Sequence, residues 1–347
     1  MQTHDMFITG VGSYLPQTVT VEQAVEQGLY PPDAVEEHQL GGAAVAGDVS
    51  APEMALMAAE EAVKRSGGSP EEIDLLLYAD TWHQGPDGWQ PQYYVQRHLL
   101  GDKALGLEIR QGCNGMFSAM ELAAGHLRAV PERRRALLVA SDNYGTPLMD
   151  RWRSGPGFII GDAASALVLD KEHGFAQLLS VTSGIVSESE EVHRYGEELF
   201  PPGCTSGREV DFAARSAAFN RRALTEAGGT RVWPKVHQLI GDIVRQSLDE
   251  AGIGLDDVTR VAMMNHSREI TEQRFLAVLG LPLSRSTWEF GRMVGHIGAS
   301  DQIVSLDHLV ATGGLGPGDH MLLFSVGPGI TVSSAVVRVL HDAPWRA

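Results

Sequence analysis

An internal duplication is the feature that most constrains how this chain of 347 residues folds. Residues 51–66 have the spacing of an amphipathic helix, and a Gly/Ser/Pro turn and an apolar strand-like run at 73–79 follow them. The same order returns at 236–251 and 258–264. This period is far too long for a solenoid repeat. The pattern therefore predicts one α/β unit that has been copied once.

Three more paired segments follow in the same order in both halves. They are a helix-like pair at 92–100 and 271–279, a strand-like pair at 136–140 and 320–324, and a second strand-like pair at 165–169 and 334–339. Five matches in one order predict two halves packed about a pseudo-twofold axis. Two helix N-termini would then meet at the junction, where both halves can contribute to a pocket.

The duplication divides the chain into three parts. We predict a first half over 1–175, an inserted segment of loop and helix over 176–234, and a second half over 235–347. The inserted segment is richer in charge, Gly and Ser, and its composition fits either a cap over a pocket or an oligomer contact.

Composition excludes several classes of protein. A hydrophobic content of 43% with 20% charged residues is that of a globular protein, and no apolar run is long enough to span a bilayer. The first residues lack a secretory signal, so we expect a cytoplasmic protein. The net charge of −17 opposes binding to nucleic acid or to an anionic membrane. With only Cys113 and Cys204, neither a disulfide framework nor a metal site is expected, and we assign Cys204 no catalytic role.

Cys113 lies in the sequence IRQGCNGM, between a short apolar run and a helix-like run at 116–130. A cysteine at a helix N-terminus faces unpaired N–H groups and the positive end of the helix dipole, both of which favour a reactive thiolate. The alternative is a small buried residue behind a turn. In the register of the duplication, Cys113 faces residues 294–301 of the second half, and we expect both stretches to follow a strand and to open a helix.

Five short motifs in order resemble those of the β-ketoacyl-acyl carrier protein synthase III family, which has the thiolase-like fold. They are ITGVGSYLP at 8–16, the Cys113 turn, IGDAASA at 160–166, NHSRE at 265–269 and VGPG at 326–329. The resemblance covers nearly the whole chain. It implies a five-layered αβαβα fold, a homodimer, and acyl transfer through a cysteine thioester.

One departure from the family changes the expected chemistry. The family carries an Asn in a GNTSAAS motif, whereas this chain reads GHIGASD at 295–301 and has His296 in its place. A histidine can accept a proton near neutral pH, and Asp301 could orient its ring. Together, Cys113, His296 and Asp301 suit transfer of an acyl group to a hydroxyl, amine or thiol. The alternative is that His296 is a tolerated replacement.

This pattern is similar to the synthase-III-like acyltransferases of secondary-metabolite pathways, which include polyketide and antibiotic biosynthesis. The resemblance implies that His266 assists thiolate formation or binds the thioester oxygen. It also implies an oxyanion hole made by the Cys113 N–H and a glycine N–H. Because Pro328 has no N–H, Gly327 or Gly329 must be the second donor.

A second departure concerns the acyl donor. The family's basic clamp for coenzyme A is missing from AVEEHQLGG at 34–42. We therefore expect the phosphopantetheine arm of an acyl carrier protein as donor, with coenzyme A less favoured and no bound cofactor. Lys235 and Arg268 lie near where the family docks that acidic protein, and we assign them to docking.

The loop WHQGPDGW at 82–89 follows a predicted strand, and such loops often line pockets in α/β folds. We assign Trp82, His83 and Trp89 to the substrate pocket. The alternative is that the tryptophans cover the dimer seam or the core.

Three functions follow as hypotheses. The first is transfer of a malonyl-type or small aromatic polyketide acyl group from a carrier protein, through Cys113, to a small-molecule acceptor or a second carrier thiol. The second is a priming synthase that condenses an acyl starter with malonyl-carrier protein. The third is a non-catalytic scaffold that binds carrier protein.

Overall fold

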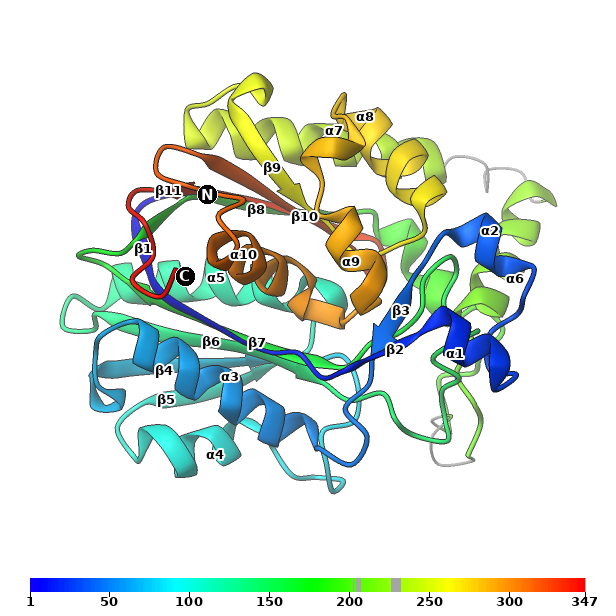
Figure 1. Ribbon diagram of the computed structural model, residues 1–347, viewed down its shortest axis with the longest axis horizontal. Coiled ribbons are helices and arrows are strands. Elements are labelled where there is room, and N and C mark those ends of the chain that lie inside the picture. Colours follow the sequence, from blue (N-terminus) through cyan, green and yellow to red (C-terminus); the bar gives the residue numbers. More distant parts are fainter. Residues whose placement is uncertain (202, 204–206, 226–231, 347) are drawn as a thin grey trace.

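The computed structural model describes residues 1–201, 203, 207–225 and 232–346. Within these residues, nine strands form one sheet, and β1 and β8 join its two halves near the middle (Figure 1). In spatial order the strands are β5 (Leu105–Ile109), β4 (Ile73–Ala79), β6 (Arg135–Asp142), β7 (Ala163–Asp170), β1 (Gln2–Tyr14), β8 (Ala176–Ile185), β11 (Thr331–Val339), β10 (His320–Gly327) and β9 (Val258–Ala262).

The two halves of the sheet and the helices on their faces form five layers. Helices α5 (Gly115–Ala129) and α10 (Asp301–Ala311) lie between the two halves of the sheet (Figure 1). Helix α3 (Ala51–Arg65) covers the outer face of the first half, and α7 (Val232–Ala251) covers that of the second. The predicted thiolase-like αβαβα architecture is confirmed.

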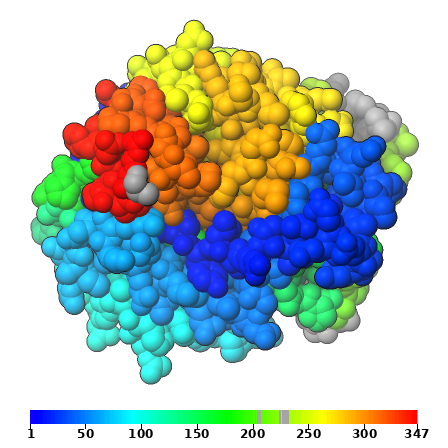
Figure 2. Space-filling model, in the orientation of Figure 1, coloured from blue at the N-terminus to red at the C-terminus, as the bar shows by residue number. Residues whose placement is uncertain are grey.

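The smaller elements complete the chain. They are β2 (Thr18–Thr20), β3 (Gly42–Ala44), α1 (Val21–Glu26), α2 (Ala34–His38), α4 (Gln92–Val95), α6 (Phe212–Thr225), α8 (Ala277–Leu279), α9 (Trp288–Val294), the π-helical η2 (Gln96–Leu100) and η8 (Ile270–Leu276), and the short 3-10 helices η1 (Pro70–Glu72), η3 (Gly112–Asn114), η4 (Ser187–His193), η7 (Leu255–Asp257), η9 (Leu283–Arg285) and η10 (Gly298–Ser300). Figure 2 shows the N-terminal segment, in dark blue, lying along the boundary between the surfaces of the two halves.

Close packing of α3 on β1 explains two features of the N-terminal sequence. The face of α3 toward the sheet is rich in alanine, and the facing positions of β1 are Gly10 and Gly12. A Cβ at Gly10 would lie 2.1 Å from the Ala62 carbonyl oxygen, and one at Gly12 would lie 2.2 Å from that of Ala58. Only glycine lets the helix and the strand approach so closely.

The structure corrects the predicted boundary of the inserted segment. Residues 176–185 form β8, which pairs with both β1 and β11 and is therefore part of the central sheet. Its serines and threonines gave it the composition of a loop. Two of them, Ser180 and Thr182, are buried, and α7 provides their partners: the Ser180 hydroxyl donates to the Ser247 carbonyl oxygen (2.7 Å), and that of Thr182 donates to Glu250 (2.9 Å).

The stretch before His296 was also predicted wrongly. Cys113 follows a strand, β5, but His296 follows the helix α9. In the second half, the described residues at the position equivalent to β5 form no strand, but an isolated bridge between Val261 and Ser286. The two halves therefore match in their central strands and differ at their edges.

Candidate functional site

Cys113 lies in the short helix η3, immediately before the long helix α5. The turn requires glycine at 112, which has φ +56°, and a Cβ there would lie 2.4 Å from Cδ of Pro328. On the other side, the Asn114 amide donates to the Thr331 carbonyl oxygen (3.0 Å) and to the Ser333 hydroxyl (2.7 Å). Residues of the second half thus fix the cysteine turn of the first.

His296 lies within hydrogen-bond distance of this cysteine. Its Nε2 is 3.0 Å from Sγ of Cys113. The histidine backbone is held in turn by the first half, because its N–H donates to the Ile159 carbonyl oxygen (2.7 Å) and its carbonyl accepts from the Gly161 N–H (2.9 Å). The pair therefore forms across the junction of the two halves.

Asp301, the first residue of α10, orients the histidine from the opposite side. Its Oδ2 is 2.5 Å from Nδ1 of His296, and its Oδ1 accepts from the Ile297 N–H (2.9 Å). Asn265 adds two further bonds to this carboxylate, from its side-chain amide (3.0 Å) and from its backbone N–H (3.2 Å). The sequence analysis missed this role of Asn265, although its position next to His266 placed it in a recognised motif.

This arrangement favours the charged form of the His296 ring. Burial opposes the charge, but the Asp301 carboxylate and the Cys113 sulfur outweigh it and raise the pKa of His296 well above its usual value. The ring therefore retains a proton, which it can share with the sulfur and later release.

His266 lies beside His296 but in the opposite electrostatic state. The two rings are stacked with centroids 5.9 Å apart, and burial together with the charge of His296 lowers the pKa of His266 to about 3. Its carbonyl oxygen accepts from the indole N–H of Trp288 (3.1 Å), and its Nδ1 has no hydrogen-bond partner among the described residues. His266 is therefore a neutral imidazole, able to donate a hydrogen bond, beside the charged imidazole of His296.

Comparison with known proteins places the chain in a family. The sequence models for 3-oxoacyl-acyl-carrier-protein (ACP) synthase III and for its C-terminal part match residues 107–185 and 248–339. The solved structure of ChlB3, described as an acyltransferase, is 60% identical and covers 98% of this chain and 99% of its own, with a TM-score of 0.93. The chain belongs to the 3-oxoacyl-acyl-carrier-protein synthase III family of enzymes.

More distant members match over nearly their full length. The β-ketoacyl-acyl-carrier-protein synthases III of Desulfitobacterium hafniense (strain DSM 10664 / DCB-2) and Streptomyces coelicolor are 25% and 26% identical, and the matches cover 95% and 96% of this chain and 97% of each relative. The synthase III structure from Aquifex aeolicus is 19% identical with a TM-score of 0.77, and covers 96% of this chain and 99% of its own. That last likeness shows the shared fold.

The glycine run of this synthase III family member lies against the cysteine turn. Gly327 ends β10, and a Cβ there would lie 2.7 Å from Oδ1 of Asn114. Pro328 packs on Gly112, and Gly329 adopts φ +73° in the turn that leads to β11. The structure thus places Gly327 and Pro328 against the residues on either side of Cys113, whereas a Cβ built at Gly329 meets no atom within 4 Å.

Of the three predicted pocket residues, the structure brings only Trp82 into a buried cluster. Trp82 is 8% exposed and packs with Tyr144, and the same cluster includes the partly buried Phe158. His83 is exposed and touches the Trp82 ring edge-on. Trp89 is 39% exposed and packs on Tyr94, outside this cluster. A loop sequence does not show which of its aromatic rings will turn inward.

The two residues predicted to dock a carrier protein lie at the surface and already form ion pairs. Lys235 Nζ is 2.5 Å from the Glu188 carboxylate. Arg268 Nε is 3.3 Å from Glu272, and its guanidinium lies 5.9 Å from the ring centroid of Trp288. An incoming acidic partner would have to displace these internal carboxylates. The remaining assignment, Cys204, lies outside the described residues.

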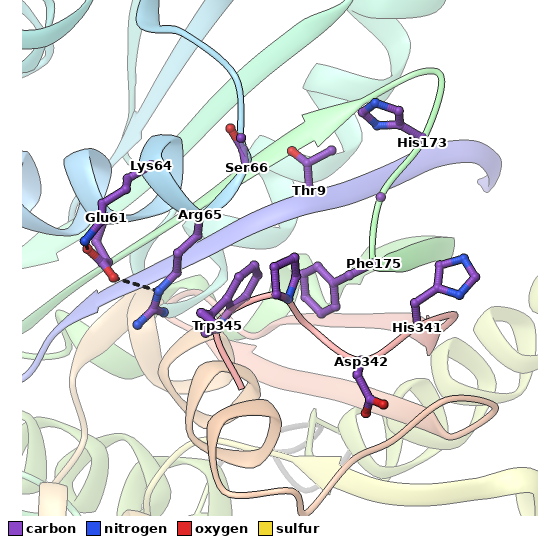
Figure 3. Close-up of a pocket in the computed structure, with 13 residues that line it drawn as sticks. Thr9, Glu61, Lys64, Arg65, Ser66, His173, Phe175, His341, Asp342 and Trp345 are labelled. Atoms are coloured by element: carbon purple, nitrogen blue, oxygen red, sulfur yellow. Dashed lines mark hydrogen bonds and ion pairs between the residues drawn. The ribbon is translucent and has the colours of Figure 1, made fainter. Parts of the chain in front are cut away.

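A groove of about 640 Å³ between the end of α3 and the C-terminal residues contains none of the predicted site residues (Figure 3). Arg65 lies over the Trp345 ring there, and Phe175 packs edge-on against the same ring.

In the described part of the chain, no three His, Cys, Asp or Glu side chains are grouped to hold a metal ion. No helix among those residues has the length and apolar character needed to cross a membrane.

Acid should destabilise the fold through His266. Its pKa is about 6.5 in an unfolded chain and about 3 in the fold, so the unfolded state binds the proton first as the pH falls. The free energy of unfolding should drop by about 1 kcal/mol per pH unit below pH 6.5 through this residue. Urea unfolding at pH 6.5, 5.5 and 4.5 gives the free energy of unfolding at each pH. This free energy should fall less steeply with decreasing pH in His266→Gln than in the wild-type protein.

His193 provides the comparison for this measurement. Burial lowers the pKa of His193 to about 4. His193→Gln should therefore also weaken the dependence of the unfolding free energy on pH, but through a group outside the site. Equal slopes in the wild type and in His266→Gln would show that His266 is not buried as a neutral ring.

Proposed function

We propose that this synthase III family member is an acyltransferase that accepts an acyl group from an acyl carrier protein on Cys113 and passes it to a hydroxyl, amine or thiol. The observation that carries the proposal is the continuous chain from Cys113 through His296 to Asp301, with distances of 3.0 and 2.5 Å. An imidazole in this place can accept and return protons, which the amide of an asparagine cannot do.

In the proposed first step, Nε2 of His296 already carries the proton that it shares with Cys113, and the Cys113 thiolate Sγ attacks the carbonyl carbon of the donor thioester. The oxyanion accepts hydrogen bonds from the Cys113 N–H and from the N–H of Gly327 or Gly329. When the tetrahedral intermediate collapses, the C–S bond to the carrier breaks. His296 then gives its Nε2 proton to the departing pantetheine thiolate, which leaves as the thiol, and the His296 ring is left neutral.

In the second step, His296 acts as base toward the acceptor. Nε2 takes the acceptor proton while the acceptor atom attacks the acyl carbon, and Asp301 stabilises the imidazolium that forms. The C–S bond to Cys113 breaks, and the thiolate again shares the proton now held by Nε2 of His296, which restores the starting state. His266 remains neutral and can donate one hydrogen bond toward the thioester oxygen without competing for this proton.

Similarity to ChlB3 supports acyl transfer over condensation, because a protein 60% identical over nearly its whole length is described as an acyltransferase. On the resemblance of the GHIGASD motif to the synthase-III-like acyltransferases of secondary-metabolite pathways, we propose a reaction in secondary metabolism with a malonyl-type or small aromatic polyketide acyl group as cargo. The second candidate, a priming synthase, is favoured by the β-ketoacyl-acyl-carrier-protein synthases III that match at 25% and 26% identity.

A panel of acyl-loaded carrier proteins tests the proposal. Intact-protein mass spectrometry after mixing should show an added acyl mass on the wild-type protein, and peptide mapping should place it on Cys113. Malonyl-carrier protein is then added to the acyl-enzyme. Release of carbon dioxide with a β-ketoacyl product would replace the acyltransferase proposal by the priming synthase, and no mass gain with any donor would contradict both.

Carrier docking through Lys235 and Arg268 predicts a change in KM. The charge-reversal variants Lys235→Glu and Arg268→Glu should raise the KM for carrier-bound donor about 10-fold at low salt, with kcat nearly unchanged, because charge complementarity acts on encounter. The effect should shrink as salt is added. Arg245→Glu, an exposed change on the same helix as Lys235, is the control and should leave KM unchanged.

We further propose that the protein is a homodimer joined at β5. This strand ends the sheet, so among the described residues it pairs only with β4, and Leu105 and Leu107 are 42% and 47% exposed. An exposed apolar edge strand is a site for pairing with another chain. Light scattering on a sizing column should give twice the chain mass for the wild type and the monomer mass for Leu107→Lys. A monomeric wild type would contradict this assignment.

A further inference from the structure

We propose that Phe158 keeps water away from the acyl group on Cys113 and so decides between transfer to the acceptor and hydrolysis. This inference rests on the proposed function. A base that activates an acceptor hydroxyl can equally activate water. In that side reaction, water attacks the acyl carbon, its proton goes to His296, the C–S bond breaks and a free carboxylic acid leaves. An enzyme with this chemistry therefore needs a means of excluding water.

The Phe158 ring lies against both catalytic imidazoles. Its centroid is 4.9 Å from that of His266 and also 4.9 Å from that of His296, with interplanar angles of 88° and 72°. Because Nε2 of His296 is 3.0 Å from the Cys113 sulfur, an acyl group on that sulfur is carried close to this ring. The space beside the two histidines is thus occupied by an apolar side chain.

The backbone on each side of Phe158 is bonded to the histidine segments themselves. Before it, the Gly157 carbonyl oxygen accepts from the N–H of Ser267, the residue after His266 (2.7 Å). After it, the Ile159 carbonyl oxygen accepts from the N–H of His296 (2.7 Å). The position of Phe158 relative to both imidazoles is therefore fixed by the fold.

Glycine at 157 is required for this arrangement. It adopts φ +79°, and a Cβ there would lie 2.4 Å from Cδ1 of Ile270. The segment can therefore lie against the His266 loop only without a side chain at this position.

Apolar residues on the other side of Phe158 extend the apolar surface that its ring begins. Phe158 is half-buried and packs on a cluster made of Trp82, Tyr144, Met149 and Ile160 with Leu148, Val210 and Phe212. An ordered water needs two to four polar partners, and this cluster offers few. The Phe158 ring beside the imidazoles therefore closes the approach from this side without offering water a site.

The test follows the lifetime of the acyl-enzyme. The protein is loaded from an acyl-carrier donor, freed of donor on a sizing column and kept without acceptor, and the acyl mass on Cys113 is followed with time. Phe158→Ala should lose the acyl group roughly 10-fold faster than the wild type, which corresponds to the loss of an apolar contact at a reacting centre. The product should be the free acid, with one oxygen from labelled water.

Two variants and a control separate exclusion of water from general damage. Phe158→Leu keeps an apolar side chain and should retain a long-lived acyl-enzyme, whereas Phe158→Gln, similar in size to leucine but polar, should hydrolyse it quickly. This comparison decides the question even if Phe158→Ala does not fold. Phe290→Ala removes a ring stacked on His308, a histidine outside the site, and should leave the lifetime unchanged.

Failure of this inference differs from failure of the proposed function. If the wild type never gains acyl mass on Cys113, the proposed function is wrong. If the wild type is acylated but Phe158→Ala and Phe158→Gln hydrolyse the acyl-enzyme at the wild-type rate, Phe158 does not exclude water and only this inference is overturned.

Discussion

Cys113→Ala is expected to abolish acyl transfer, with a fall in kcat of roughly 10⁶-fold, the scale seen when a nucleophile that acts together with its base is removed. The variant has no sulfur to carry the acyl group, so it should also gain no mass from any donor. The fold should survive, because alanine is smaller than cysteine and the turn is held by Gly112 and by the Asn114 amide.

Steady-state transfer and intact-mass spectra measure this effect, and thermal unfolding confirms the fold. Cys204→Ala removes the second of the two sulfhydryl groups in the sequence and is the matched control, with wild-type turnover expected. Undiminished transfer by Cys113→Ala would contradict the thioester mechanism, because His296 would then act directly between donor and acceptor.

The layered fold could be predicted because its signals are local and occur twice. The predicted strand at 73–79 has the same bounds as β4, and the helix predicted at 51–66 ends within one residue of α3. Apolar periodicity is a local property, so it identifies such elements well. Repetition of the order in the second half then indicated that the elements stack as two copies.

The elements that were missed depend on partners far away in the chain. In β8, Ser180 and Thr182 are buried, and their hydroxyl groups are satisfied by Ser247 and Glu250 of α7. A buried polar side chain costs free energy unless such a partner exists, and composition does not show the partner. The strand was therefore assigned to the inserted loop.

In the site, too, some features could be predicted from the sequence and others depend on the packing of the two halves. The glycine-flanked turn at Cys113 and the five-residue spacing of His296 and Asp301 are visible in the sequence. The bonds from Asn265 to the Asp301 carboxylate and the contacts of Phe158 with two imidazoles arise only when both halves have packed. The sequence thus indicates the candidate reacting groups, while the residues that hold and shield them are known only from the structure.

Asp301→Asn is expected to lower kcat by about 10⁴-fold, the cost of removing the carboxylate that orients a catalytic histidine. An asparagine amide can donate to Nδ1 and so favour the wrong tautomer, and it brings no charge to stabilise the imidazolium. The loss should be smaller than for Cys113→Ala, because the sulfur can still be acylated slowly.

The pH dependence of this variant separates a charge effect from a change of shape. Transfer from the acyl-enzyme needs a neutral His296, so the rate rises with pH through the pKa of that ring. The Asp301 carboxylate raises the pKa of His296, whereas burial lowers it, so without the carboxylate the pKa must fall. The rising limb of the single-turnover profile should therefore move to lower pH in Asp301→Asn. Asp307→Asn, which removes another buried carboxylate of α10 that is paired with Arg65, should keep the limb in place. An unshifted limb in Asp301→Asn would mean that Asp301 only shapes the turn between η10 and α10.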